Sequence, residues 1–252
     1  MKIILSLSIL TFLTSCSLDK MFLQPTNLSQ QLESGHDIND LKVTYKVKED
    51  SITAFFNPTT LQPTFLKNLT DTMNLDYTIE SVVFNSSSGN KLNGWFLKPK
   101  NVTPQVTLLH FHGNAAHIIN QHHAMIPLLN YGFQAFVFDY SGFGFSEGEA
   151  KRKNVLKDGN SALTYLKSRD DIKNTKLIIY GQSLGGHLSA VVAAQREAEI
   201  DGLVIEGAFS SHKDIAAAVA GGFSRIFVRE QYSAYKAIRD YNKPLLLIHS
   251  TE

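Results

Sequence analysis

A serine with a glycine two residues away on either side is the pattern in this sequence with the clearest chemistry. Gly181, Ser183 and Gly185 form a Gly-x-Ser-x-Gly motif. A serine hydroxyl becomes a strong nucleophile when a neighbouring base takes its proton. The motif is typical of a sharp turn from a strand into a helix, where glycine leaves space that a side chain would fill. At the start of that helix, the backbone N–H of Leu184 is expected to donate to a developing oxyanion.

The surroundings of the motif strengthen this interpretation, because the pattern alone arises by chance in roughly one chain in ten of this length. A second stretch, His112-Gly113-Asn114, follows an apolar run where a complementary donor is needed. Gly113 is expected to let the backbone turn toward the serine, and the N–H of Asn114 is then the second oxyanion donor. A plain turn after a strand explains this stretch equally well when it is taken alone.

Short apolar runs predict the strands that must position these residues. The runs are nearly continuous in hydrophobicity, which is typical of strands buried on both faces of a sheet. They are Val106–Phe111, Phe133–Phe138, Leu177–Tyr180, Leu203–Ile205 and Leu245–Ile248.

Helical stretches between these strands indicate an α/β fold. Residues 118–129 and 154–166 are predicted helices, and a further helix of small residues follows the serine. Strands that alternate with helices favour a mostly parallel sheet flanked by helices. Tyr77–Phe84 and Lys91–Leu97 flank a turn-rich connection, which predicts an antiparallel hairpin at one edge of the sheet.

Four motifs in this order and at this spacing resemble the α/β-hydrolase superfamily. They most resemble its compact serine-hydrolase branch, which has prolyl-oligopeptidase-like and serine-aminopeptidase-like members, and the resemblance covers residues 77–252. It implies Ser183 as the nucleophile, Leu184 and Asn114 as oxyanion donors, and residues 139–144 as a structural loop. The motifs are His112–Asn114, Phe138–Ser146, Gly181–Gly186 and Ile205–Ser211.

The same resemblance predicts that the catalytic acid and base lie beyond residue 252. In that branch the strand before the acid ends in His-Gly-Thr-x-Asp, and the corresponding residues are His249-Ser-Thr-Glu252. We therefore expect a fold without its last strand and helix, and a chain that is inactive as given. One alternative is a triad of Ser183, His212 and Glu206, with Glu206 as acid and His212 as base. Another is an inactive hydrolase-like lipoprotein or truncation product.

The N-terminus resembles a bacterial lipoprotein signal. Lys2 precedes an apolar stretch that is too short to span a bilayer, and Leu13-Thr-Ser-Cys16 resembles a lipobox. Cys16, the single cysteine, is the expected lipidation site; an ordinary signal peptide is the alternative. Since Ser17 is not aspartate, the lipoprotein pattern favours the outer membrane of a bacterial cell envelope over the inner.

Composition sets the remaining expectations. The chain has 252 residues and a formal net charge of +1, which gives no electrostatic footprint for nucleic acid. We expect a signal peptide at 1–15, a tether with short irregular elements at 16–74, and the hydrolase domain at 75–252. No cofactor and no metal are expected, since the histidines between positions 110 and 123 are interpreted as packing or solvated residues. The expected substrate is a small ester, thioester or peptide, and no oligomeric state is indicated.

Overall fold

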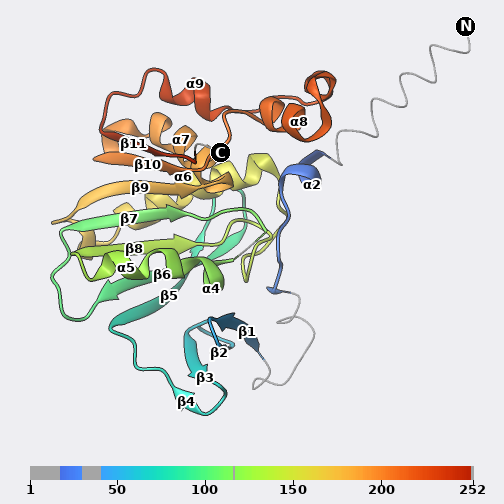
Figure 1. Ribbon diagram of the computed structural model, residues 1–252. Coiled ribbons are helices and arrows are strands. Elements are labelled where there is room, and N and C mark those ends of the chain that lie inside the picture. The colour runs from blue at the N-terminus through green and yellow to red at the C-terminus, as the bar shows by residue number, and fades with distance from the viewer. Residues whose placement is uncertain (1–17, 30–40, 116, 251–252) are drawn as a thin grey trace, which may run out of the picture.

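A seven-stranded mixed sheet forms the centre of the protein (Figure 1). The computed structural model describes residues 18–29, 41–115 and 117–250, so the predicted signal peptide, Cys16 and Glu252 lie outside the described residues. The strands lie side by side in the order β11-β10-β9-β7-β8-β6-β5. They are β5 (Tyr77–Asn85), β6 (Lys91–Pro99), β7 (Val106–Phe111), β8 (Phe133–Phe138), β9 (Lys176–Gln182), β10 (Gly202–Glu206) and β11 (Leu245–Ile248).

The pairing of these strands confirms the predicted mixed sheet. The five strands β7 to β11 run parallel to one another, whereas β6 pairs antiparallel with both β5 and β8. The β5–β6 hairpin forms one edge, as the sequence predicts. At the other edge, the four residues of β11 are exposed.

Successive residues of the central strands belong to two separate hydrophobic cores. On β7, Leu109 packs into one core and Leu108 into the other; on β8, Phe136 and Ala135 divide in the same way. Because side chains alternate across a strand, both faces of the sheet are buried. This explains the nearly continuous hydrophobicity of the strand sequences.

Helices cover both faces of the sheet (Figure 1). α6 (Arg152–Lys167) and α7 (Leu184–Gln195) belong to the first core, and α4 (Ile118–Gln121) and α5 (Ile126–Leu129) to the second. The predicted continuous helix over residues 118–129 is wrong, because a 3₁₀ turn, η2 (His122–Ala124), interrupts it. Pro127, in the first turn of α5, has no N–H to donate to the preceding turn.

The N-terminal part is more regular than the short irregular elements that we expected for residues 16–74. A short helix, α2 (Leu18–Phe22), is followed by a four-stranded antiparallel sheet that packs beneath the second core. Its strands are β1 (Lys42–Val47), β2 (Asp50–Phe56), β3 (Pro63–Lys67) and β4 (Asp71–Thr72).

A long excursion joins β10 to β11 and lies above the C-terminal end of the parallel strands. It contains α8 (His212–Ala220), the 3₁₀ turn η5 (Gly222–Ile226) and α9 (Ala234–Ile238). Two further 3₁₀ turns, η3 (Asp170–Ile172) and η4 (Glu197–Glu199), follow α6 and α7. In the part of the chain that the structure describes, no helix has the length and apolar character needed to cross a bilayer.

Candidate active site

Ser183 lies on the sharp turn between β9 and α7, as the motif predicts. Its backbone has φ 54° and ψ −116°, a left-handed conformation that a residue with a side chain adopts at an energetic cost. Two hydrogen bonds hold the turn: the Ser183 N–H donates to the Glu206 carbonyl at 2.8 Å, and the His187 N–H donates to the Ser183 carbonyl at 3.1 Å. The serine side chain is exposed. The strained turn therefore presents the hydroxyl to solvent.

The two motif glycines allow this turn to pack against the end of β7. A Cβ on Gly185 would lie 1.9 Å from the carbonyl oxygen of Phe111, and one on Gly181 would lie 2.3 Å from the carbonyl oxygen of Gly185. No side chain fits at either distance. A Cβ on Gly113 would approach the Ser183 Cβ at an ordinary 3.8 Å, so Gly113 lies beside the serine without being required by space.

The two predicted oxyanion donors have available N–H groups. Leu184 is the first residue of α7, and a first-turn N–H has no acceptor within its own helix. Within the described residues, the N–H of Asn114 has no hydrogen-bond partner. The residue with a left-handed backbone in this loop is Ala115, with φ 58°.

The N-terminal segment holds the Asn114 side chain through two hydrogen bonds, and no sequence motif indicated this contact. The Asn114 amide donates to the Phe22 carbonyl at 3.0 Å, and its oxygen accepts from the Gln24 N–H at 2.9 Å. These partners are about 90 residues away along the chain, so no local pattern signals the contact.

The loop after β8 contacts the segment around His112 from the other side. Asp139 accepts from the Ile118 N–H at 2.9 Å, and its carboxylate lies 3.5 Å from Nε2 of His112. The Tyr140 hydroxyl donates to the carbonyl of His112 at 2.9 Å. Asp139 and Tyr140 are fully buried. These contacts tie His112, next to Gly113, to the loop over residues 139–144.

The structure does not join Ser183, His212 and Glu206 by hydrogen bonds. Glu206 accepts from the Tyr180 hydroxyl and, at 3.3 Å, from the Gln182 amide. Burial and the Glu206 carboxylate both raise the pKa of Tyr180. The imidazole of His212 instead contacts Glu230. Within the described residues, no hydrogen bond reaches the Ser183 hydroxyl, so no described histidine is placed as its base.

The histidines of the oxyanion side are mostly packing residues. Burial lowers the pKa of His110 and of His122 to about 3, which keeps both rings neutral. His122 packs on Trp95 with ring centroids 5.1 Å apart. Adjacent helical residues are expected to point apart, yet the rings of His122 and His123 lie 4.2 Å apart, because the chain leaves α-helical geometry there.

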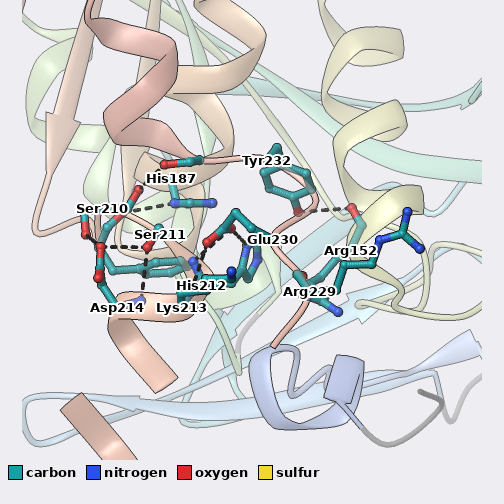
Figure 2. A network of polar contacts seen from close by, with 12 residues as sticks. Arg152, His187, Ser210, Ser211, His212, Lys213, Asp214, Arg229, Glu230 and Tyr232 are labelled. Atoms are coloured by element: carbon teal, nitrogen blue, oxygen red, sulfur yellow. Dashed lines mark hydrogen bonds and ion pairs between the residues drawn. The ribbon is translucent and has the colours of Figure 1, made fainter. Parts of the chain in front are cut away.

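A second group of polar residues lies one helical turn beyond the serine (Figure 2). His187 of α7 and His212 of α8 are fully buried, with ring centroids 4.7 Å apart, and His212 contacts Glu230 at 2.9 Å. Burial and, less strongly, His212 lower the pKa of His187 to about 4. In the sequence, His212 was considered only as a possible base for Ser183, and only the excursion between β10 and β11 brings it to His187.

Comparison with known sequences places this geometry in a family. The sequence model described as serine aminopeptidase, S33, matches residues 102–252. The uncharacterized protein YfhR of Escherichia coli is 34% identical over 180 residues, which cover 69% of this chain and 62% of the relative. The α/β hydrolase domain-containing protein WAV2 of Arabidopsis thaliana is 30% identical over 193 residues, covering 70% and 61%. The chain thus spans about three fifths of the length of these curated relatives.

Solved structures agree with the fold. The esterase Pf2001 of Pyrococcus furiosus aligns with a TM-score of 0.54 and 20% identity, over 68% of this chain and 70% of that chain. Est1E of Butyrivibrio proteoclasticus, solved with ferulic acid bound, aligns with a TM-score of 0.55 and 20% identity, over 67% and 78%. At this level of identity, the likeness shows the fold alone.

Proposed function

Because this chain belongs to the serine aminopeptidase S33 family of α/β serine hydrolases, we propose that it hydrolyses a small ester through an acyl-enzyme on Ser183. The observation that carries the proposal is the left-handed turn that holds Ser183 between β9 and α7. The Ser183 oxygen attacks the ester carbonyl while a base takes its proton. The Leu184 and Asn114 N–H groups donate to the oxyanion, the leaving alcohol takes the proton, and water then releases the acid.

An ester is favoured over a thioester or a peptide by the solved structures of the same fold. The Pyrococcus furiosus protein is named an esterase, and Est1E was solved with ferulic acid bound. A leaving alkoxide also departs more easily than an amide nitrogen, which needs a well-placed acid to protonate it.

We propose further that the acid and the base lie outside the described residues. The Ser183 hydroxyl has no partner among the described residues, and the nearby His212 is engaged by Glu230. A serine without a base is a poor nucleophile. The 252-residue chain by itself is therefore expected to show almost no labelling by a fluorophosphonate probe. Strong labelling that disappears in Ser183→Ala would overturn this second proposal and support the first.

The test of the hydrolase uses the protein as its gene encodes it, from the native start codon to the native stop codon. We expect hydrolysis of short-chain p-nitrophenyl esters and slower hydrolysis of aminoacyl p-nitroanilides. Ser183→Ala should reduce kcat by several orders of magnitude, up to about a million-fold. Equal ester hydrolysis by the folded wild type and by Ser183→Ala would refute Ser183 as the nucleophile.

We also propose that lipidated Cys16 tethers the protein to the outer membrane of a bacterial envelope. Two observations support a membrane on this side of the molecule. Helix α2, which begins two residues after Cys16, lies beside α8, and the rings of Phe22 and His212 are 5.1 Å apart (Figure 1). The adjoining surface is apolar and exposed, with exposed fractions between 61% and 74% for Val219, Phe223, Ile226 and Phe227.

Cell fractionation tests the tether. The wild type should be recovered with the membranes and should incorporate labelled palmitate, because several acyl chains on one residue give stable anchoring. Cys16→Ser should leave the protein soluble and unlabelled. Recovery of both proteins in the same fraction would contradict the proposal.

A further inference from the structure

We propose that His187, His212 and Glu230 form a binding site for a divalent transition-metal ion, of which Zn²⁺ fits best. One potential ligand atom from each residue lies within 4.8 Å of the other two. From the sequence we expected no metal, because only the histidines between positions 110 and 123 were considered as ligands and these were interpreted as packing or solvated residues. The inference does not depend on the proposed hydrolase activity.

Hydrogen bonds to the Nδ1 atoms prepare both rings for a metal. Nδ1 of His187 lies 3.0 Å from the Phe209 carbonyl, and Nδ1 of His212 lies 2.9 Å from the Glu230 carboxylate. Both partners only accept hydrogen bonds, so each Nδ1 carries the proton and each neutral ring keeps its lone pair on Nε2. The Phe209 carbonyl therefore supports His187 as a ligand through Nε2, because it orients the ring through the other nitrogen. On His212 the ion would take the place of the Nδ1 proton that now lies between the ring and Glu230, and this proton would be released on binding.

The two Nε2 atoms have no partner of their own. Both side chains are fully buried, and neither Nε2 makes a hydrogen bond within the described residues. A buried acceptor without a donor is unfavourable, so each lone pair calls for a metal ion or a water molecule.

Glu230 retains capacity for an ion. One of its oxygens accepts from the N–H and the Nδ1–H of His212, and the other accepts from the Lys213 N–H. An ionised carboxylate offers about four lone-pair sites, so one remains. Two histidines, one carboxylate and an open position are a known ligand set for Zn²⁺.

The spacing requires only a small adjustment on binding. Donor atoms about 2 Å from a tetrahedral ion lie about 3.3 Å from one another. Since the present separations do not exceed 4.8 Å, each donor needs to move by about 0.9 Å or less. An ion here would join α7, the start of α8 and the segment before α9. It would thereby hold the excursion between β10 and β11 onto the helix that begins after Ser183 (Figure 2).

Calorimetry and spectroscopy on the full chain test the site. After removal of metals with a chelator, titration with Zn²⁺ should show one saturable site per chain. The Tm should rise by about 5–10 °C at a hundredfold excess over Kd. Co²⁺ should give the intense visible absorption of a tetrahedral complex, which ions at scattered surface histidines do not give.

Variants connect the binding to the three residues. His187→Gln and Glu230→Gln should each weaken Zn²⁺ affinity by at least about tenfold and abolish the Co²⁺ spectrum. The control is His249→Gln, which changes an exposed histidine outside the group and should bind as the wild type does. If His187→Gln does not fold, Glu230→Gln, whose side chain is 17% exposed, carries the test. If the folded wild type binds no Zn²⁺, the free ring nitrogens of His187 and His212 are paired with water or have no partner. That outcome, or binding unchanged in the variants, overturns the proposal.

Discussion

Replacing Gly185 by alanine should lower the Tm of the protein markedly, because the turn that presents Ser183 has no room for an added methyl group. A Cβ there would lie 1.9 Å from the Phe111 carbonyl oxygen, 2.4 Å from the Phe111 carbonyl carbon and 2.6 Å from the His112 carbonyl oxygen. All three are backbone atoms at the end of β7, so no side-chain rotation relieves the contact.

The size of the effect follows from that distance. Ordinary contacts of a Cβ begin near 3.4 Å, so the start of α7 must move away from β7 by about 1.5 Å. Both elements are fixed by the first hydrophobic core, in which Phe111 and Leu188 are fully buried. We therefore expect a loss of about 3 kcal/mol, the upper end of the usual overpacking effects. For a chain of this size, that corresponds to a fall in Tm of about 6–12 °C.

Thermal unfolding followed by circular dichroism measures this change. Gly222→Ala is the matched control, because a Cβ there meets no atom within 4 Å and the backbone is not left-handed. Its Tm should stay within about 2 °C of that of the wild type. If Gly185→Ala unfolds at the same temperature as Gly222→Ala, the close contact between the turn and β7 is not present in the protein.

Two further predictions concern charge. Asp19→Asn should lower the free energy of unfolding by about 1–3 kcal/mol, because it removes the negative charge 2.6 Å from the buried Arg152. The exposed Asp170→Asn should change it by less than about 0.5 kcal/mol in the same urea titration. Acidification from pH 7 toward pH 4 should also destabilise the protein. His110 and His122 have a pKa of about 3 when folded and about 6.5 when unfolded, so the unfolded chain binds more protons between these values. The free energy of unfolding from urea titrations should fall in this window by up to about 1.4 kcal/mol per pH unit and histidine, and a pH-independent value would contradict the buried neutral rings.

The central sheet was predictable from the sequence because its strands are buried on both faces. The predicted bounds of Val106–Phe111, Phe133–Phe138 and Leu245–Ile248 agree with β7, β8 and β11. The small sheet of residues 42–72 was not predicted, because its outer strand β1 is only six residues long and none of them is buried. A short, exposed strand gives a weak signal until its partner is known.

The candidate site was likewise predictable only where it depends on residues close together in the sequence. The turn at Ser183 depends on residues within a few positions, so a local motif predicts it. The contact of His212 with Glu230 joins residues 18 positions apart, and that of Asn114 with Phe22 joins residues 92 apart. Contacts of this kind depend on how the elements pack, and no periodicity or spacing encodes them.

The docking of α2 has a consequence for the order in which the protein folds. Its partners, Asn114 and Arg152, are 92 and 133 residues away from it, so these contacts close some of the longest loops in the chain. Long loops close late, because the chain loses conformational entropy before the new contact compensates for it. A segment early in the sequence is thus among the last to reach its place. Until it does, the Asn114 side chain lacks the two hydrogen bonds that hold it.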